Sequence, residues 1–311
     1  MYEQFFGCRE RPFDLTPNPR YLVLTDAHRE ALSNLEYGIA SRKGITLLVG
    51  EAGSGKTTVI RAAIARQPAP VHCVHLNNPT LSRQEFGQML AVRFGLSEQA
   101  AQSKTSMLVE LEALLRARHA QAETTVLIVD EAHSLSMELL EEIRLLANIE
   151  TDDEKLMPVI IAGQPELIQG LNDPALRQFK QRIALRCELT PLTAAETKTY
   201  IAGRVRAAGG EPDQILTADA IALIHERSHG IPRLINVIAD NALLGGFAAG
   251  TKPVDSGCVR DVCQDFDLGP SPDRARATAP APARQRKAGV EGELLFSAFA
   301  GKRRRFRFFD Q

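Results

Sequence analysis

The feature that most constrains the fold is a glycine-rich stretch, Gly50–Thr58, that follows an apolar run and precedes a segment free of glycine and proline. The apolar run, residues 45–49, predicts a buried strand, and residues 59–67 predict a helix. Strand, glycine-rich loop, Lys-Thr and helix together form the phosphate-binding P-loop pattern. The alternative is a glycine turn that arose by chance, and it leaves the flanking strand and helix unexplained.

The groups in this stretch suit the phosphates of a nucleotide. Its glycines let backbone N–H groups point at phosphate oxygens, and the N-terminus of the helix adds partial positive charge. We expect Lys56 to reach the β- and γ-phosphates and the Thr57 hydroxyl to bind Mg²⁺. The predicted nucleotide-binding residues are Gly50, Glu51, Ala52, Gly53, Ser54, Gly55, Lys56, Thr57 and Thr58.

A second apolar run, residues 126–130, ends in the two carboxylates of Asp130 and Glu131. Such a run predicts a buried parallel strand, and its carboxyl end is where open α/β sheets place ligands. We expect Asp130 to hold Mg²⁺, as the acid of a Walker B element does, and Glu131 to polarise the attacking water. The alternative is that both acids only cap the next helix. We expect His133 to pack or hydrogen-bond locally.

Apolar runs and helical patterns alternate along residues 45–189. This alternation predicts a parallel sheet covered by helices on both faces. The expected strands are 45–49, 71–76, 126–130, 158–162 and 183–189. The expected helices are 26–40, 57–67, 83–94, 107–120, 138–147 and 165–171.

The strand patterns stop after Pro191, and three helical patterns follow at 194–208, 218–228 and 232–247. From Gly269 the chain is rich in Ala, Pro, Arg and Gly, which predicts disorder. We therefore expect an α/β P-loop core with a five-stranded parallel sheet, a small all-helical lid domain and a disordered tail. The expected domains are 1–43 as a lead-in of the core, 44–190 as the P-loop domain, 191–268 as the lid and 269–311 as the tail.

The net charge of −1 hides an asymmetry between the tail and the rest of the chain. Residues 269–311 carry ten basic and four acidic residues, which leaves 27 basic and 34 acidic residues in 1–268. The tail therefore carries +6 and the rest −7. Basic residues are interleaved with aromatic residues in 302–309. The tail is therefore either an arm that binds anionic lipid or nucleic acid, or an inert solvated end.

Several features indicate a cytoplasmic protein. The five cysteines are scattered and predict neither a disulfide framework nor a zinc site. No apolar run approaches the roughly 18 residues of a membrane span, and no secretory signal is visible at the N-terminus.

A P-loop α/β domain followed by a helical lid resembles the AAA+ ATPases, and the resemblance covers residues 1 to about 268. It implies that Gln164 is the sensor 1 residue near the γ-phosphate, although many members carry Asn or Thr there. Arg233, which follows Pro232, resembles the sensor 2 arginine of the lid. Arg182 is the first candidate for the arginine finger that points into a neighbouring subunit's site, and Arg177 is the second.

The match extends to one family within these ATPases. The chain opening and the motifs at 162–167 and 228–236 are similar to those of the general secretion pathway protein A family. The resemblance implies ATP and Mg²⁺ as ligands, a homo-oligomer, and a partner in a secretion or pilus complex that the ATPase assembles or remodels. Long members continue into a transmembrane helix and a peptidoglycan-binding region. We expect a short form without them, which reaches the inner membrane only through a partner.

Other functions share this core. A DNA-linked AAA+ regulator, of the transposon target-selection or origin-recognition type, carries a similar Gly-Ile-Pro-Arg motif, but the acidic residues 1–268 disfavour binding to a phosphate backbone. A nucleotide-gated scaffold without turnover would not need Glu131 or Arg182. The Asp-Glu-Ala-His letters suggest a helicase, but there is no second α/β domain. Tyr21, Leu22 and His28 are candidates for the adenine slot, with core packing as the alternative.

Overall fold

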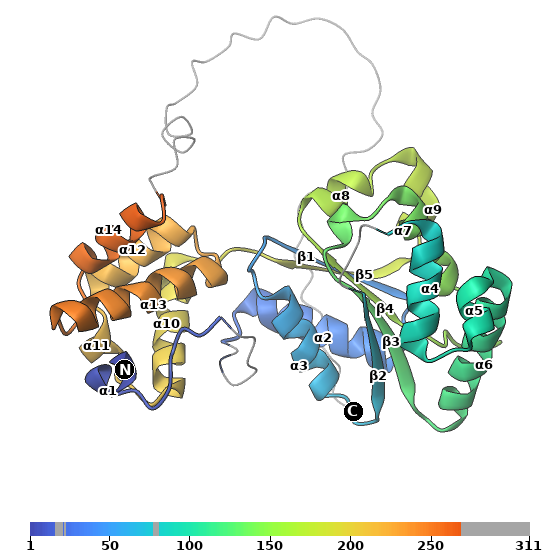
Figure 1. The fold of residues 1–311 in the computed structure, drawn as a ribbon, viewed down its shortest axis with the longest axis horizontal. Helices are drawn as coiled ribbons and strands as arrows, with labels where there is room; N and C mark the ends of the chain where they lie inside the picture. The colour runs from blue at the N-terminus through green and yellow to red at the C-terminus, as the bar shows by residue number, and fades with distance from the viewer. Residues whose placement is uncertain (16–20, 22, 77–80, 269–311) are drawn as a thin grey trace, which may run out of the picture. The chain divides into compact units, whose positions relative to one another are not determined.

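A computed structural model describes residues 1–15, 21, 23–76 and 81–268 of the chain (Figure 1). The predicted strands form one parallel sheet in the order β2-β3-β4-β1-β5. Their bounds are β1 Ile45–Gly50, β2 Val71–Leu76, β3 Thr124–Val129, β4 Val159–Gly163 and β5 Ile183–Leu189. This order puts β1, the strand that leads into the glycine-rich loop, between β4 and β5.

Three strands differ slightly from their predicted bounds. β1 ends one residue later than predicted, at Gly50, and β3 ends one residue earlier, at Val129. β3 begins at Thr124 rather than 126, because Thr124 and Thr125 pair with Val71 and His72 of β2. β4 begins at Val159, one residue later than predicted. Val159 is the first residue of β4 that pairs with its neighbours, opposite Ile45 of β1 and Leu127 of β3.

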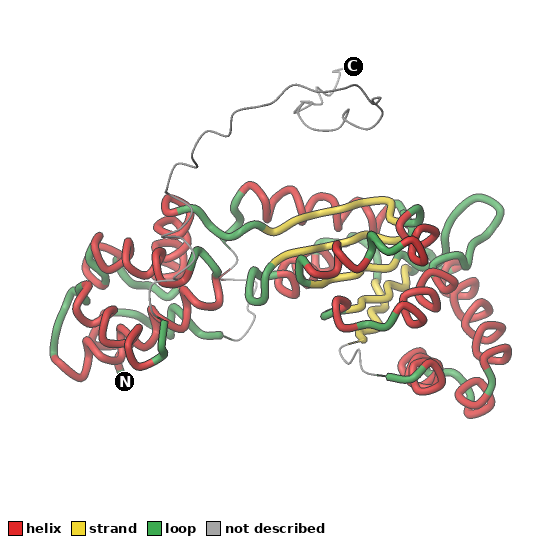
Figure 2. The backbone as a smooth tube through the Cα atoms, turned by 90° about the horizontal axis from the view of Figure 1, so that it is seen from above, coloured by secondary structure: helices red, strands yellow, loops and turns green. Residues whose placement is uncertain are grey.

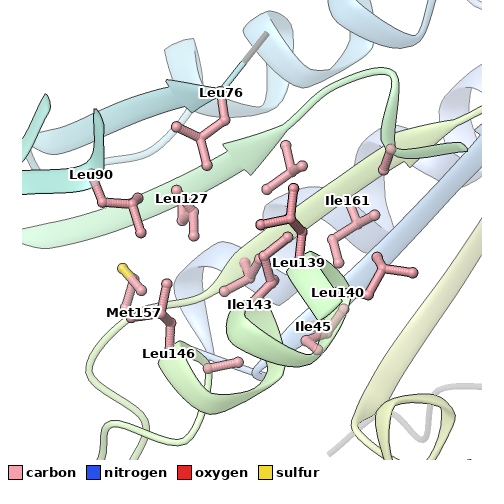
Figure 3. Close-up of a cluster of buried hydrophobic side chains, with 14 of the residues drawn as sticks. Ile45, Leu76, Leu90, Leu127, Leu139, Leu140, Ile143, Leu146, Met157 and Ile161 are labelled. Atoms are coloured by element: carbon pink, nitrogen blue, oxygen red, sulfur yellow. The ribbon is translucent and has the colours of Figure 1, made fainter. Parts of the chain in front are cut away.

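Alternate residues of each strand face opposite sides of the sheet, and both sides are buried. One hydrophobic cluster contains Leu48 and Ile160 with residues of α2 (Asp26–Ala40) and α3 (Lys56–Ala65). The other contains Leu127 and Ile161 with residues of α4 (Arg83–Phe94) and α7 (Met137–Leu146). Figure 3 shows the α7 side chains of this second cluster facing the strands. Helices on both faces explain why the strands are near-continuous apolar runs.

The connection between β2 and β3 holds one helix more than predicted. α4 is followed by α5 (Glu98–Gln102) and α6 (Lys104–Ala120). Ser97 and Ser103 cap these two helices, so α6 begins three residues before the predicted start. The sheet domain also contains α8 (Glu166–Gly170), α9 (Arg177–Lys180) and the 3-10 turns η2 (Ala132–Ser134) and η3 (Pro174–Leu176).

Residues 190–268, the described part of the chain after β5, are helical, as predicted, but have five helices where three were expected. Figure 2 shows helices and loops there, while the strands lie together in the sheet. The helices are α10 Ala194–Ala207, α11 Pro212–Ile215, α12 Ala218–Ser228, α13 Pro232–Ala249 and α14 Ser256–Asp265. The two unexpected ones are α11, which is a single turn, and α14, which buries only Val259, Val262 and Cys263.

The first residues of the chain pack with these helices. α1 (Tyr2–Phe6) lies against α13, where the rings of Phe5 and Phe247 are 5.5 Å apart, and Figure 1 shows α1 beside the helical region. Phe13 is fully buried in the same cluster. The expected lead-in of the core is therefore divided, because only its second part, α2, packs on the sheet. The predicted tail, 269–311, lies outside the described residues.

Candidate nucleotide-binding site

The glycine-rich loop connects the carboxyl end of β1 to α3, which begins at Lys56. Lys56 is buried, and its Nζ donates to the carbonyl oxygens of Gly50 at 2.8 Å and Glu51 at 3.1 Å. Burial lowers the pKa of Lys56, while the carboxylates of Glu131, Asp130 and Glu51 oppose that shift. The ammonium group is therefore held at the base of the loop, within reach of the acids that end β3.

Gly53 brings this loop against the helical domain. Its φ of 81° lies in the left-handed region, and a Cβ added there would sit 2.4 Å from Cβ of Arg233. The Arg233 N–H donates to the Gly53 carbonyl at 3.2 Å. Since Pro232 begins α13, the N-terminus of this helix meets the loop directly.

Thr57 and Asp130 supply two oxygen atoms at one point. The Thr57 hydroxyl donates to Asp130 Oδ2 at 2.9 Å. Asp130 directly follows β3, and Thr57 lies in the first turn of α3. A hydroxyl and a carboxylate are oxygen ligands of the kind Mg²⁺ takes when phosphates and water complete its shell. No group of three or more His, Cys, Asp or Glu that could hold a metal occurs in the described part of the chain.

Glu131 follows with a backbone in the left-handed region, at φ 54°. Its N–H donates to Asp130 Oδ1 at 3.0 Å, and its carboxylate accepts from Gln164 Nε2 at 3.5 Å. The same carboxylate lies 3.5 Å from His133 Nδ1, and Gln164 Nε2 lies 3.1 Å from His133 Nε2. Gln164 follows β4, so side chains from two adjacent strand ends contact the Glu131 carboxylate. His133 was expected to pack or hydrogen-bond locally, but its ring pairs with Gln164, 31 residues later in the chain.

A cavity of about 410 Å³ opens beside these groups. Its lining includes Tyr21 and His28 of the predicted adenine slot, whereas Leu22 lies outside the described residues. The His28 ring lies 3.1 Å from the Ser54 carbonyl through Nε2 and 2.6 Å from Thr25 Oγ1 through Nδ1. Burial lowers the pKa of His28.

Sequence reasoning missed three residues that line this cavity from the helical domain: Tyr200, Arg204 and Asn236. Asn236 could have been predicted, because it lies one turn after Arg233 on α13 and so shares its face of the helix. Tyr200 and Arg204 stand on α10 four residues apart without a motif, and no pattern in the sequence marks them.

The two predicted arginine fingers lie away from this site. Arg182 immediately precedes β5, at the amino ends of the strands, about 20 Å from the glycine-rich loop along the six residues of β1. It lines a separate cavity of about 760 Å³ with Gly44, Glu150 and Lys155. Arg177 is exposed at the start of α9. Neither arginine is placed to act on the loop of its own chain.

Known proteins match this chain both in sequence and in fold. Residues 39–171 match a family model described as an AAA domain. The chain is 40% identical over 259 residues to general secretion pathway protein A of Aeromonas hydrophila, an alignment that covers 83% of this chain and 47% of that protein. The chain thus spans about half the length of this curated relative.

Solved structures show the same fold at low identity. The Aeropyrum pernix ORC2 protein, in its ADPNP and ADP complexes, gives a TM-score of 0.62 at 17% identity, over 88% of this chain and 75% of that one. Cdc6p of Pyrobaculum aerophilum gives 0.62 at 17% identity, over 86% and 74%. Thermotoga maritima RuvB gives 0.51 at 18% identity, over 79% and 71%.

Within the described ranges, no helix has the length and apolar character needed to cross a bilayer. The sheet order, the glycine-rich loop, the strand-end acids and the helical domain agree with the identity to the Aeromonas protein. The chain belongs to the AAA+ ATPases, in the family of general secretion pathway protein A.

Proposed function

We propose that this chain hydrolyses ATP with Mg²⁺ and uses the energy to assemble or remodel a secretion or pilus complex. The observation that carries the hydrolytic part is the hydrogen bond from Thr57 to Asp130, with Glu131 next to it, because the predicted metal ligands and the predicted base share one sheet edge with Lys56. The part about the complex is supported by identity to general secretion pathway protein A.

The residues divide the chemistry between them. Lys56 and the loop N–H groups bind the β- and γ-phosphates, where the buried ammonium acts in a region of low dielectric. Thr57 and Asp130 would hold Mg²⁺, which supplies charge neutralisation at the phosphates. Glu131 accepts a hydrogen bond from the attacking water, and Gln164 with His133 keeps its carboxylate oriented.

The arrangement calls for a second copy of the chain. Arg182 is exposed at the opposite end of the strands, so it would serve the phosphates of a neighbouring subunit. Arg233 belongs to the helical domain and lines the cavity of its own chain, so it would link the nucleotide to movement of that domain. The position of Arg182 supports a homo-oligomer. Its position would be the cytoplasmic side of the inner membrane, reached through a partner.

The likeness to origin-recognition proteins shows the fold alone and carries no DNA binding to this chain. The acidic balance of residues 1–268 also disfavours a DNA-facing role.

The test separates binding from turnover. Lys56→Ala should lose ATP binding, because the phosphates lose their main counter-charge. Glu131→Gln should bind ATP as the wild type does but hydrolyse it far more slowly, because an amide does not take a proton from water. ATP affinity is measured by calorimetry and turnover by phosphate release. The exposed Glu138→Gln is a matched control that should change neither. Equal loss of ATP affinity in the Lys56 and Glu131 variants would contradict the assigned roles.

A further inference from the structure

Arg204 organises one wall of the nucleotide cavity. It lies on α10, its residue is 7% exposed, and its guanidinium makes three hydrogen bonds. Nε donates to the Pro12 carbonyl at 2.6 Å, Nη2 to the Asp14 carbonyl at 2.9 Å, and Nη1 to the Tyr200 hydroxyl at 2.9 Å. Two of its three acceptors are thus backbone atoms of the N-terminal segment, 190 or more residues away in sequence. The N-terminal segment here means the described residues 12–15, 21 and 23–25.

The same guanidinium packs on aromatic rings. Its central carbon lies 4.9 Å from the ring centre of Tyr21 and 5.6 Å from that of Tyr200. The Tyr200 hydroxyl in turn donates to Asn236 Oδ1 at 3.0 Å. Arginine presents several donors in a fixed plane and stacks on aromatic faces, and lysine cannot reproduce that combination. Arg204 therefore fixes Tyr21 against α10 and α13.

The N-terminal segment is also tied to the glycine-rich loop. Val23 passes so close to α10 that a Cβ on Gly203 would lie 2.9 Å from its Cγ2. Further along, Thr25 binds the His28 ring, and that ring lies 3.1 Å from the Ser54 carbonyl. The segment is thus held by Arg204 at one end and by the loop at the other.

We propose that Arg204 is a positioning residue that holds the N-terminal segment as the wall for the nucleoside end of ATP. Lys56 and Thr57 fix the triphosphate at one end of the cavity, so the base and ribose extend toward the remaining lining. That lining includes the apolar or aromatic side chains of Leu15, Tyr21 and Val23. A nucleoside needs a concave, largely apolar surface of this kind. The inference rests on the proposed function, because it assumes that ATP is the ligand.

Loss of Arg204 should lower the affinity for ATP, because the N-terminal segment would no longer be held in place as the wall of the cavity. Two buried carbonyl groups and one hydroxyl would lose their donor, which disfavours the ordered position of the segment. If only a fraction of the molecules keeps the wall in place, the apparent affinity for ATP falls by that fraction. Inorganic tripolyphosphate has no nucleoside and contacts only the loop, so its affinity should not change.

The experiment compares the dissociation constants of ATP and inorganic tripolyphosphate in the full chain by calorimetry. Arg204→Met should weaken ATP binding about tenfold or more, a loss of about 1.4 kcal/mol or more, and change tripolyphosphate binding less than about twofold. Arg204→Lys should fall between Arg204→Met and the wild type, because it keeps the charge but not the full set of donors. Arg206→Met, at an exposed arginine of the same helix, is the matched control and should bind both ligands as the wild type does. At saturating ATP, turnover of Arg204→Met should stay near that of the wild type.

Two results would overturn the inference: unchanged ATP affinity in Arg204→Met, or equal loss of ATP and tripolyphosphate, which would show a general structural role. If Arg204→Met fails to fold, Tyr200→Phe provides the test, since it removes one acceptor and the link to Asn236 but leaves both carbonyl contacts. It should weaken ATP by a smaller factor and leave tripolyphosphate unchanged, and an equal loss of both would again refute the proposal. A wild type that binds tripolyphosphate but not ATP would refute the proposed function instead.

Discussion

Replacement of Gly53 by alanine tests whether the loop and the helical domain must touch for ATP to bind. The new Cβ would lie 2.4 Å from Cβ of Arg233, where contacts shorter than 3.4 Å are already tight. The start of α13 therefore has to retreat by about 1 Å or more before ordinary van der Waals contact is restored. Arg233 then no longer donates to the Gly53 carbonyl at its present 3.2 Å.

The free-energy cost of Gly53→Ala has two parts, one from the backbone and one from the lost contact with Arg233. An L-residue in the left-handed region costs about 1–2 kcal/mol, and Gly53 has a φ of 81°. The lost hydrogen bond to Arg233 adds about 0.5–1.5 kcal/mol. The second part applies only while the helical domain is against the loop. ATP binding that needs this contact should therefore weaken by up to about tenfold.

Gly95→Ala is a control that measures the backbone cost alone. Gly95 ends α4 with a φ of 70°, and nothing lies within 4 Å of an added Cβ. It should lower the free energy of unfolding by the backbone cost alone and leave ATP affinity unchanged. Urea denaturation gives the first quantity and calorimetry the second.

A second substitution should rescue the ATP affinity of Gly53→Ala. Arg233→Gly removes the Cβ that Gly53→Ala would meet, so adding Gly53→Ala to that variant should cost no further ATP affinity. If Gly53→Ala and Gly95→Ala reduce ATP affinity equally, or if Arg233→Gly rescues nothing, the contact does not govern binding.

Two further predictions concern the neighbouring subunit and pH. Arg182→Ala should bind ATP normally but hydrolyse it about 10³-fold more slowly. Mixing it with Lys56→Ala should restore turnover, because the Lys56 variant still offers its own Arg182. If phosphate release does not recover in the mixture, Arg182 is not donated between subunits. Burial lowers the pKa of His28 below its ordinary value of 6.5, so the unfolded chain binds more protons as pH falls through that value and the free energy of unfolding decreases. His28→Asn should therefore lose less stability than the wild type between pH 7.5 and 5.5 in urea denaturation, and equal losses would refute the assignment.

Much of the fold was predictable, because its strands are long apolar runs and its helices have clear caps. The predicted bounds of α2, α4 and α12 agree with the structure to the residue. The missed helices lack a long apolar pattern, although Asp255 caps α14 and Ser97 caps α5. α14 has few apolar positions, and α1 forms a helix whose apolar residues are buried against α13, a partner that local sequence does not reveal.

The site residues also fall into those that the sequence predicts and those that it does not. Lys56, Thr57, Asp130 and Glu131 belong to contiguous motifs whose geometry follows from the strand and loop that carry them. Gln164 was placed by its resemblance to sensor 1, and the structure sets it beside Glu131. Arg204 was not predictable, because its role depends on contacts with Pro12 and Asp14, far along the chain.

The packing of α1 with the helical domain has a consequence for synthesis. Tyr2 bonds to Asp240, 238 positions later, and Pro12 to Arg204, 192 positions later. A ribosome that adds 5–20 residues per second needs about 10–50 s to make the intervening chain. During that time the strands can pair, while the apolar face of α1 and Phe13 lack their partner helices. Sequence changes in α1 or at Phe13 should thus affect late assembly and aggregation during translation, even where the sheet itself forms normally.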